Sequence, residues 1–118
     1  MNSTYRAATC TALTGPSSIR IFEQDARPLQ GGEVRIQVHA AGLNFPDLLM
    51  TQGKYQFRPD PPFVPGLEAA GEVIEVASDI HSVKPGDRVM AGGKGGALAE
   101  QWVVSAAAVS PLPAALSF

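Results

Sequence analysis

The chain has 118 residues, of which 45% are hydrophobic and 17% are charged, and its formal net charge is −2. This length supports one domain with a single core. The charge balance excludes the basic surface typical of proteins that bind nucleic acid or anionic membranes, and no apolar run has the length of a membrane span. We therefore expect no nucleic-acid partner and no membrane partner.

The chain contains one cysteine, Cys10. One cysteine forms no internal disulfide and supplies no cysteine cluster for zinc. We expect a reducing, cytoplasmic location and an inert, partly buried thiol.

The first third of the chain predicts strands at residues 5–11, 19–23 and 33–40. The pattern is clearest in the third of these strands, where apolar residues alternate with polar ones. A period of two places one face in the core and the other, with Arg35 and His39, on a polar surface.

One short helix is predicted at residues 45–52. Asn44 is a suitable N-cap, Pro46 fits the first turn, and Asp47 suits the positive end of the helix dipole. Gly53 predicts the end of the helix.

A loop follows at residues 54–65, because its four prolines disfavour regular pairing. It carries Tyr55, Phe57 and Phe63, whose rings predict either packing or the wall of a cleft.

The last part of the chain predicts strands at residues 68–77, 88–91 and 97–105, with a flexible hairpin connector at 92–96. Gly71 in the first of these marks a bulge or a close approach of two backbones. Short strands joined by turns predict a mainly β fold with one or two short helices, paired antiparallel as a partly open β-barrel.

The residues offer few groups for chemistry. The glycines at 92–96 fit neither the dinucleotide fingerprint nor a P-loop. His39 and His81 are the only histidines and lie 42 positions apart. We expect no metal site, because zinc takes three or four Cys, His or carboxylate ligands.

Three segments carry a family resemblance: VHAAGLNFPD at 38–47, PGLEAAGEV at 65–73 and VKPGDRV at 83–89. Together with the ending LPAALSF at 112–118, they resemble the medium-chain dehydrogenase/reductase superfamily, in its zinc-free quinone oxidoreductase branch. The resemblance covers nearly the whole chain, and its specificity comes from the order and spacing of the segments.

The resemblance implies that residues 1–118 form the GroES-like catalytic domain of such an enzyme. It also implies a Rossmann domain after residue 118, outside this sequence, which would hold most of NADPH or NADH. The active site would be the cleft between the two domains, and the full-length enzyme a homodimer. The chain alone is expected to be inactive.

The resemblance also bears on zinc. Zinc-dependent members have a cysteine where this chain has Asn44 and a histidine where it has Leu67. Leucine ligates no metal and a neutral amide is a poor zinc ligand, so zinc-free chemistry is expected.

Residue roles follow from the resemblance. The Asn44 amide would contact the nicotinamide end of the cofactor or the substrate oxygen, unless it serves only as a helix N-cap. Tyr55 would line the substrate cleft as a hydroxyl donor, or only pack its loop. Asp47 and Glu68 would support the site through helix-end electrostatics or a salt bridge.

The implied function is reduction of a quinone or a conjugated enone by hydride transfer without zinc. Two alternatives remain open. One is an enoyl reductase acting on a thioester, as in polyketide synthases, and the other is a non-enzymatic structural or binding domain.

Overall fold

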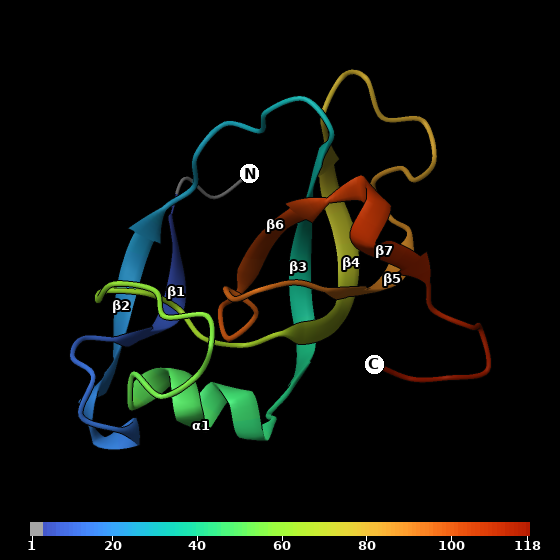
Figure 1. The fold of residues 1–118 in the computed structure, drawn as a ribbon. Helices are drawn as coiled ribbons and strands as arrows, with labels where there is room; N and C mark the ends of the chain where they lie inside the picture. The colour runs from blue at the N-terminus through green and yellow to red at the C-terminus, as the bar shows by residue number, and fades with distance from the viewer. Residues whose placement is uncertain (1–3) are drawn as a thin grey trace.

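The computed structural model describes residues 4–118, which form seven strands, one α-helix and two 3₁₀ turns (Figure 1). In chain order the elements are β1 (Thr4–Cys10), η1 (Pro16–Ser18), β2 (Ile19–Asp25), β3 (Glu33–Gly42), α1 (Phe45–Thr51), β4 (Glu68–Val76), β5 (Arg88–Gly92), β6 (Gln101–Ser105), η2 (Ala106–Ala108) and β7 (Val109–Pro111). Within these residues no helix combines the length and the apolar character needed to cross a bilayer.

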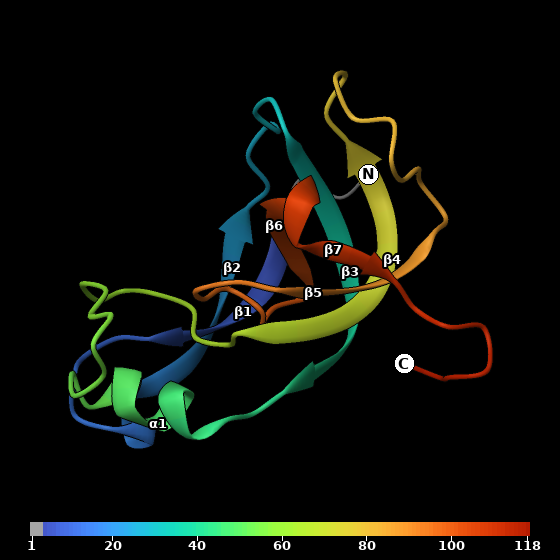
Figure 2. The same cartoon turned by 45° about the vertical axis from the view of Figure 1, so that its right-hand side comes forward.

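The strands form two antiparallel sheets, one of β1 and β2 and one in the order β6-β3-β4-β5-β7. Two isolated bridges, Ala7 to Ala99 and Cys10 to Phe63, link the small sheet to the rest of the fold. Figure 2 shows the curved β3 and β4 beside β1 and β2, with α1 below them. The predicted partly open, mainly β barrel is therefore confirmed.

The core of the barrel is apolar and lies within the five-stranded sheet. Val34, Ile36, Val73 and Val89 are each at most 1% exposed, and Trp102 is 5% exposed. Burial of this kind contributes roughly 1.5–3 kcal/mol per large side chain. The alternating apolar positions of β3 thus supply the barrel interior.

The opposite face of β3 differs from the prediction. Arg35 is 1% exposed, although the alternating pattern predicted a position on a polar surface. Its guanidinium donates to Glu75 at 2.9 Å and to the carbonyl of Arg27. Both faces of this part of β3 are therefore covered, and a charged side chain is buried with its partners.

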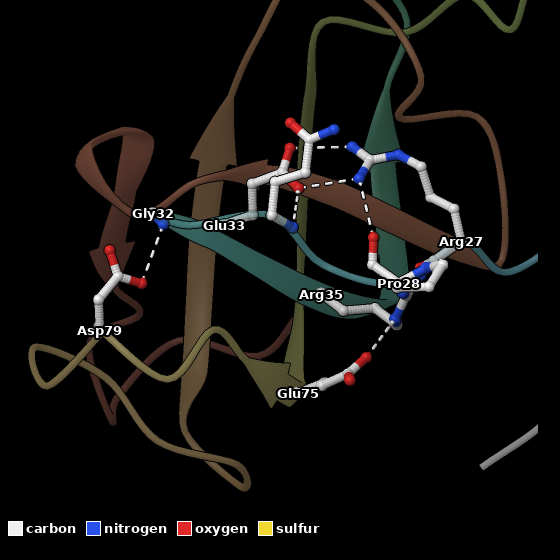
Figure 3. Close-up of polar contacts among 8 residues, drawn as sticks. Arg27, Pro28, Gly32, Glu33, Arg35, Glu75 and Asp79 are labelled. Carbon is white, nitrogen blue, oxygen red and sulfur yellow. Dashed lines mark hydrogen bonds and ion pairs between the residues drawn. The ribbon is translucent and has the colours of Figure 1, made fainter.

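A network of ion pairs surrounds the start of β3 (Figure 3). Arg27 donates two hydrogen bonds to the Glu33 carboxylate, at 2.8 and 2.9 Å, and the Gln30 amide donates a third at 2.8 Å. The hydrogen bonds from Arg27, followed by that from Gln30, lower the pKa of Glu33 to about 2. Across the loop, Asp79 accepts from the Gly32 amide at 3.0 Å.

Gly71 marks a close approach of two backbones, as the sequence predicted. A Cβ atom here would overlap the carbonyl oxygen of Gln37 on the neighbouring strand. The pairing of β3 and β4 also shifts register between Val38 and Ala40. A side chain at position 71 would force these two strands apart.

The strand predicted at residues 97–105 is shorter, because β6 begins only at Gln101. The preceding residues bond to two other parts of the chain. Ala97 and Leu98 donate to the carbonyls of Gly66 and Pro65, while the Leu98 carbonyl accepts from Ala8. Tertiary contacts thus replace a continuous strand ladder here.

The glycine-rich segment 92–96 is neither a hairpin nor a loose connector, so that prediction was wrong. The strands on either side of it do not pair with each other. Gly93 donates to the Leu67 carbonyl at 2.9 Å and Gly96 to the Val64 carbonyl at 2.7 Å. A Cβ at either glycine would lie 2.8 Å from the Trp102 ring, so glycine is required for close packing on that indole.

Candidate functional site

Asn44 lies between β3 and α1, where the chain turns out of the sheet. Its backbone is extended, and its carbonyl accepts from the Asp47 amide at 3.0 Å, as at a helix N-cap. Its side-chain amide donates to the Glu68 carboxylate at 3.2 Å. The residue therefore starts the helix through its backbone and directs its amide toward β4.

Asp47 is buried and fastens the helix to the following loop. Its carboxylate accepts from the Asn44 amide at 2.9 Å and from the Gly66 amide at 3.0 Å. Both donors are backbone groups, and Gly66 is buried, so removing the Asp47 carboxylate would leave a buried N–H group without its partner. Asp47 thus fixes the approach of residues 44 and 66, which flank the site.

Glu68 begins β4 and pairs across the sheet with Gly42 at the end of β3. A Cβ at Gly42 would overlap the Glu68 carboxylate. The absence of a side chain at position 42 therefore gives Glu68 room to reach Asn44. Glu68 is exposed, so its carboxylate is available to a molecule entering from solvent.

An open groove of about 620 Å³ lies beside Glu68. Its walls are mostly small residues of β3, β4 and β5, namely Ala40, Ala41, Gly42, Ala69, Ala70, Ala91 and Gly92. Met90 and Leu67 add larger apolar surface to it. A concave apolar surface edged by a few polar groups is typical of a small-molecule site.

Tyr55 lies in a second pocket of about 410 Å³, together with Phe57 and Lys94. Leu67 lines both this pocket and the groove. The structure thus brings Asn44, Asp47 and Glu68 into one hydrogen-bonded unit. It places Tyr55 in a neighbouring pocket that shares Leu67 as a wall.

The surface beside Asn44 is apolar and exposed. Leu43 is 76% exposed and Phe45 is 68% exposed, on either side of that asparagine. Asn44 is thus flanked in sequence by two large apolar side chains that are exposed to solvent. Sequence reasoning missed this feature, although GLNFPD places two large apolar residues around a polar one.

Lys94 is a second feature that sequence reasoning missed. The glycines around it were interpreted as a turn, so the lysine between them received no role. It lines the same pocket as Tyr55, 39 positions earlier in the chain, so the local sequence carries no signal for this position.

No group of three or more His, Cys, Asp or Glu side chains in residues 4–118 is placed to hold a metal ion. His39 stacks on Phe118 with ring centroids 4.2 Å apart. Arg88 covers the same Phe118 ring, 4.6 Å from its centroid. These contacts engage His39 in packing of the chain end.

Residues 30–114 match the family model of the alcohol dehydrogenase GroES-like domain. This segment is most of the chain, so the chain belongs to that domain family. Within the medium-chain dehydrogenase/reductase superfamily it is of the quinone oxidoreductase type.

The relatives support this placement. The chain is 43% identical over 115 residues to the quinone oxidoreductase-like protein 2 homolog of Nematostella vectensis, covering 97% of this chain and 31% of that protein. The human synaptic vesicle membrane protein VAT-1 homolog-like protein has a similar structure, with a TM-score of 0.94 and 34% identity over 99% of this chain and 37% of that one. For the quinone oxidoreductase of Thermus thermophilus, solved also with NADPH, the TM-score is 0.79 with 37% identity over 95% of this chain and 34% of that one. The chain thus spans about a third of the length of these relatives.

Proposed function

We propose that the chain is the substrate-side domain of an NAD(P)H-dependent oxidoreductase that reduces a quinone or a conjugated enone without zinc. The observation that carries this proposal is the apolar groove edged by the Asn44–Glu68 pair, beside the Tyr55 pocket. A flat conjugated ring fits small apolar walls, and its carbonyl oxygen needs only a few polar groups at the edge. Two of the relatives named above carry quinone oxidoreductase names, those of Nematostella vectensis and Thermus thermophilus.

In this proposal Asn44 meets the nicotinamide end of the cofactor, and the phosphates are held outside the glycine-rich loop. The amides of Gly93 and Gly96 already donate to protein carbonyls, so the glycine-rich loop has no free cradle of N–H groups there. Asn44, exposed beside the groove, is the residue we assign to the nicotinamide carboxamide. When bound, the cofactor supplies the hydride.

The side chains around the groove have distinct tasks in this proposal. Glu68 orients the Asn44 amide by accepting one of its protons, which leaves the other for a substrate or cofactor oxygen. The Tyr55 hydroxyl is a second donor to the substrate. Leu67 gives both pockets an apolar wall against which the substrate ring would pack.

The residues do not fit a catalytic zinc. The positions that carry ligands in zinc-dependent members hold Asn44 and Leu67 here, and the Asn44 amide is engaged by Glu68. A metal therefore has no part in the proposed reaction. Polarisation of the carbonyl falls to hydrogen bonds, which suffice for quinones and enones because these are already good hydride acceptors.

The test is NADPH and NADH oxidation by the complete gene product containing this chain, with a quinone, an enone and an enoyl thioester as separate acceptors. We expect turnover with the quinone and the enone, and at least tenfold lower kcat/KM in Asn44→Ala, about the loss of one oriented hydrogen bond to a reacting oxygen. Tyr55→Phe keeps the ring and removes only the hydroxyl. Turnover with the thioester alone would favour the enoyl reductase alternative, and no turnover with any acceptor would favour a binding domain.

We also propose that the complete protein is a cytoplasmic homodimer that binds no zinc. Stoichiometric zinc in the purified protein, with activity lost on chelation, would contradict the zinc-free mechanism. Light scattering of the complete protein measures the oligomeric state directly.

A further inference from the structure

Lys94 lines the Tyr55 pocket, and it lies in a loop whose backbone is hydrogen-bonded to other parts of the chain. The residues around it are fixed by hydrogen bonds from Gly93 to Leu67, from Gly96 to Val64, and from the Trp102 indole to the Gly95 carbonyl at 2.9 Å. Hydrogen bonds therefore hold the backbone on both sides of Lys94, the one charged residue of the glycine-rich segment.

The pocket that Lys94 lines is formed by Tyr55, Gln56, Phe57, Leu67, Gly93 and Lys94. Lys94 is the only charged member of this lining, and no carboxylate within residues 4–118 forms an ion pair with it. Arg58 lies on the loop that carries Tyr55, and its guanidinium donates to the Tyr55 carbonyl at 3.3 Å. The pocket thus combines aromatic surface with positive charge.

We propose that this pocket binds the anionic end of the substrate, a carboxylate, sulfonate or phosphate carried by the same molecule as the conjugated carbonyl. This inference rests on the proposed function, because the reacting ring lies in the groove on the other side of Leu67. Leu67 lines both spaces, so a molecule that extends past it would contact the groove and the Lys94 pocket at once. A free ammonium beside aromatic rings selects an acidic group over a neutral one.

The experiment compares anthraquinone-2-sulfonate with anthraquinone-2-sulfonamide, which share a ring system and differ in charge. Each is titrated into the ¹⁵N-labelled chain, and affinity is taken from amide shifts of the groove and the 92–96 loop. We expect the sulfonate to bind about three- to fivefold more tightly in low salt, and this advantage to shrink as salt is raised.

Lys94→Gln should remove the preference for the sulfonate while leaving sulfonamide binding unchanged. Lys84→Gln is the control, because it makes the same substitution at an exposed lysine outside the pocket, one that pairs with Asp87, and it should keep the preference. Lys94→Glu should reverse the preference. Lys94 is exposed, so these variants should fold, and the amide spectrum verifies this.

The outcomes separate this inference from the proposed function. If the sulfonamide shifts amides of the groove only, and the sulfonate binds no more tightly than the sulfonamide, the anion pocket alone is overturned. Shifts in neither region would overturn the pocket and the proposed quinone site together. A third arm titrates NADPH alone, and loss of NADPH binding in Lys94→Gln would overturn the assignment by showing that the lysine holds the phosphates of the cofactor.

Discussion

The two ends of β3 carry polar groups in opposite arrangements. At its start, Arg35 is buried with Glu75 and the Arg27 carbonyl, and Glu33 accepts hydrogen bonds from Arg27 and Gln30 (Figure 3). Beyond its end, Asn44 is exposed and makes one side-chain hydrogen bond, to the equally exposed Glu68.

This difference separates polar groups that hold the fold from polar groups that are free to meet a ligand. A satisfied, buried network resists any change, because each group that loses its partner stays away from water. An exposed pair beside apolar residues keeps unused hydrogen-bonding capacity. The first end is thus structural, and the second suits binding.

The largest effect is expected from breaking the buried network. Arg35→Ala should lower the free energy of unfolding by about 3 kcal/mol, because it leaves the Arg27 carbonyl unpaired and empties the space of a large buried side chain. Urea denaturation measures this loss. Arg20→Ala, at an exposed arginine on β2, should change stability by no more than about 0.5 kcal/mol.

Next in size is the buried anchor beneath the site. Asp47→Ala should cost about 2 kcal/mol, because the amides of Asn44 and Gly66 lose their acceptor. Hydrogen exchange should accelerate at those two amides first. Slow exchange at Gly66 in the variant would show that this bond does not hold the loop.

A smaller and pH-dependent effect is expected at Glu33, whose pKa of about 2 lies below that of an unfolded chain. Glu33→Gln should cost about 1 kcal/mol at pH 7, because Arg27 is half exposed and solvent weakens the pair. The carboxylate stabilises the fold above its unfolded pKa, and this contribution disappears as the pH falls toward about 2. The gap between wild type and variant, from thermal unfolding, should therefore narrow as the pH falls below about 4.5 and close near pH 2.

The smallest effect on stability is expected at the open end. Asn44→Ala should change the free energy of unfolding by about 0.5 kcal/mol, because the lost side-chain bond is exposed and the backbone cap remains. If the Asn44→Ala variant binds anthraquinone-2-sulfonamide more weakly while its stability is nearly unchanged, the end of β3 serves binding and the start of β3 serves the fold. A loss of several kcal/mol would instead place Asn44 among the residues that hold the fold.

Much of the fold follows from local pattern. The alternation in β3 predicts the inward residues Val34 and Ile36, and the sequence around Asn44 predicts the start of α1. The close approach at Gly71 was also predictable, because a mid-strand glycine has few other uses. These features depend on neighbours in sequence or on one paired strand.

The errors arise where distant segments meet. Arg35 is buried because residues after β2 return across β3, and no local pattern encodes this return. The glycines at 92–96 looked like a loose turn because their partner, Trp102, lies beyond them and packs back on the loop. Glycine permits both a turn and close packing, so its presence alone does not distinguish them.

By itself, the sequence determined the class of fold, the helix start at Asn44 and the family to which the chain belongs. It did so because strand periodicity, capping chemistry and ordered motifs are local properties. Only the tertiary structure decided that Asn44 meets Glu68, that Leu67 lines two pockets and that Lys94 and Tyr55 line the same pocket. Those contacts join residues tens of positions apart, and their geometry is fixed by strand pairing and core packing.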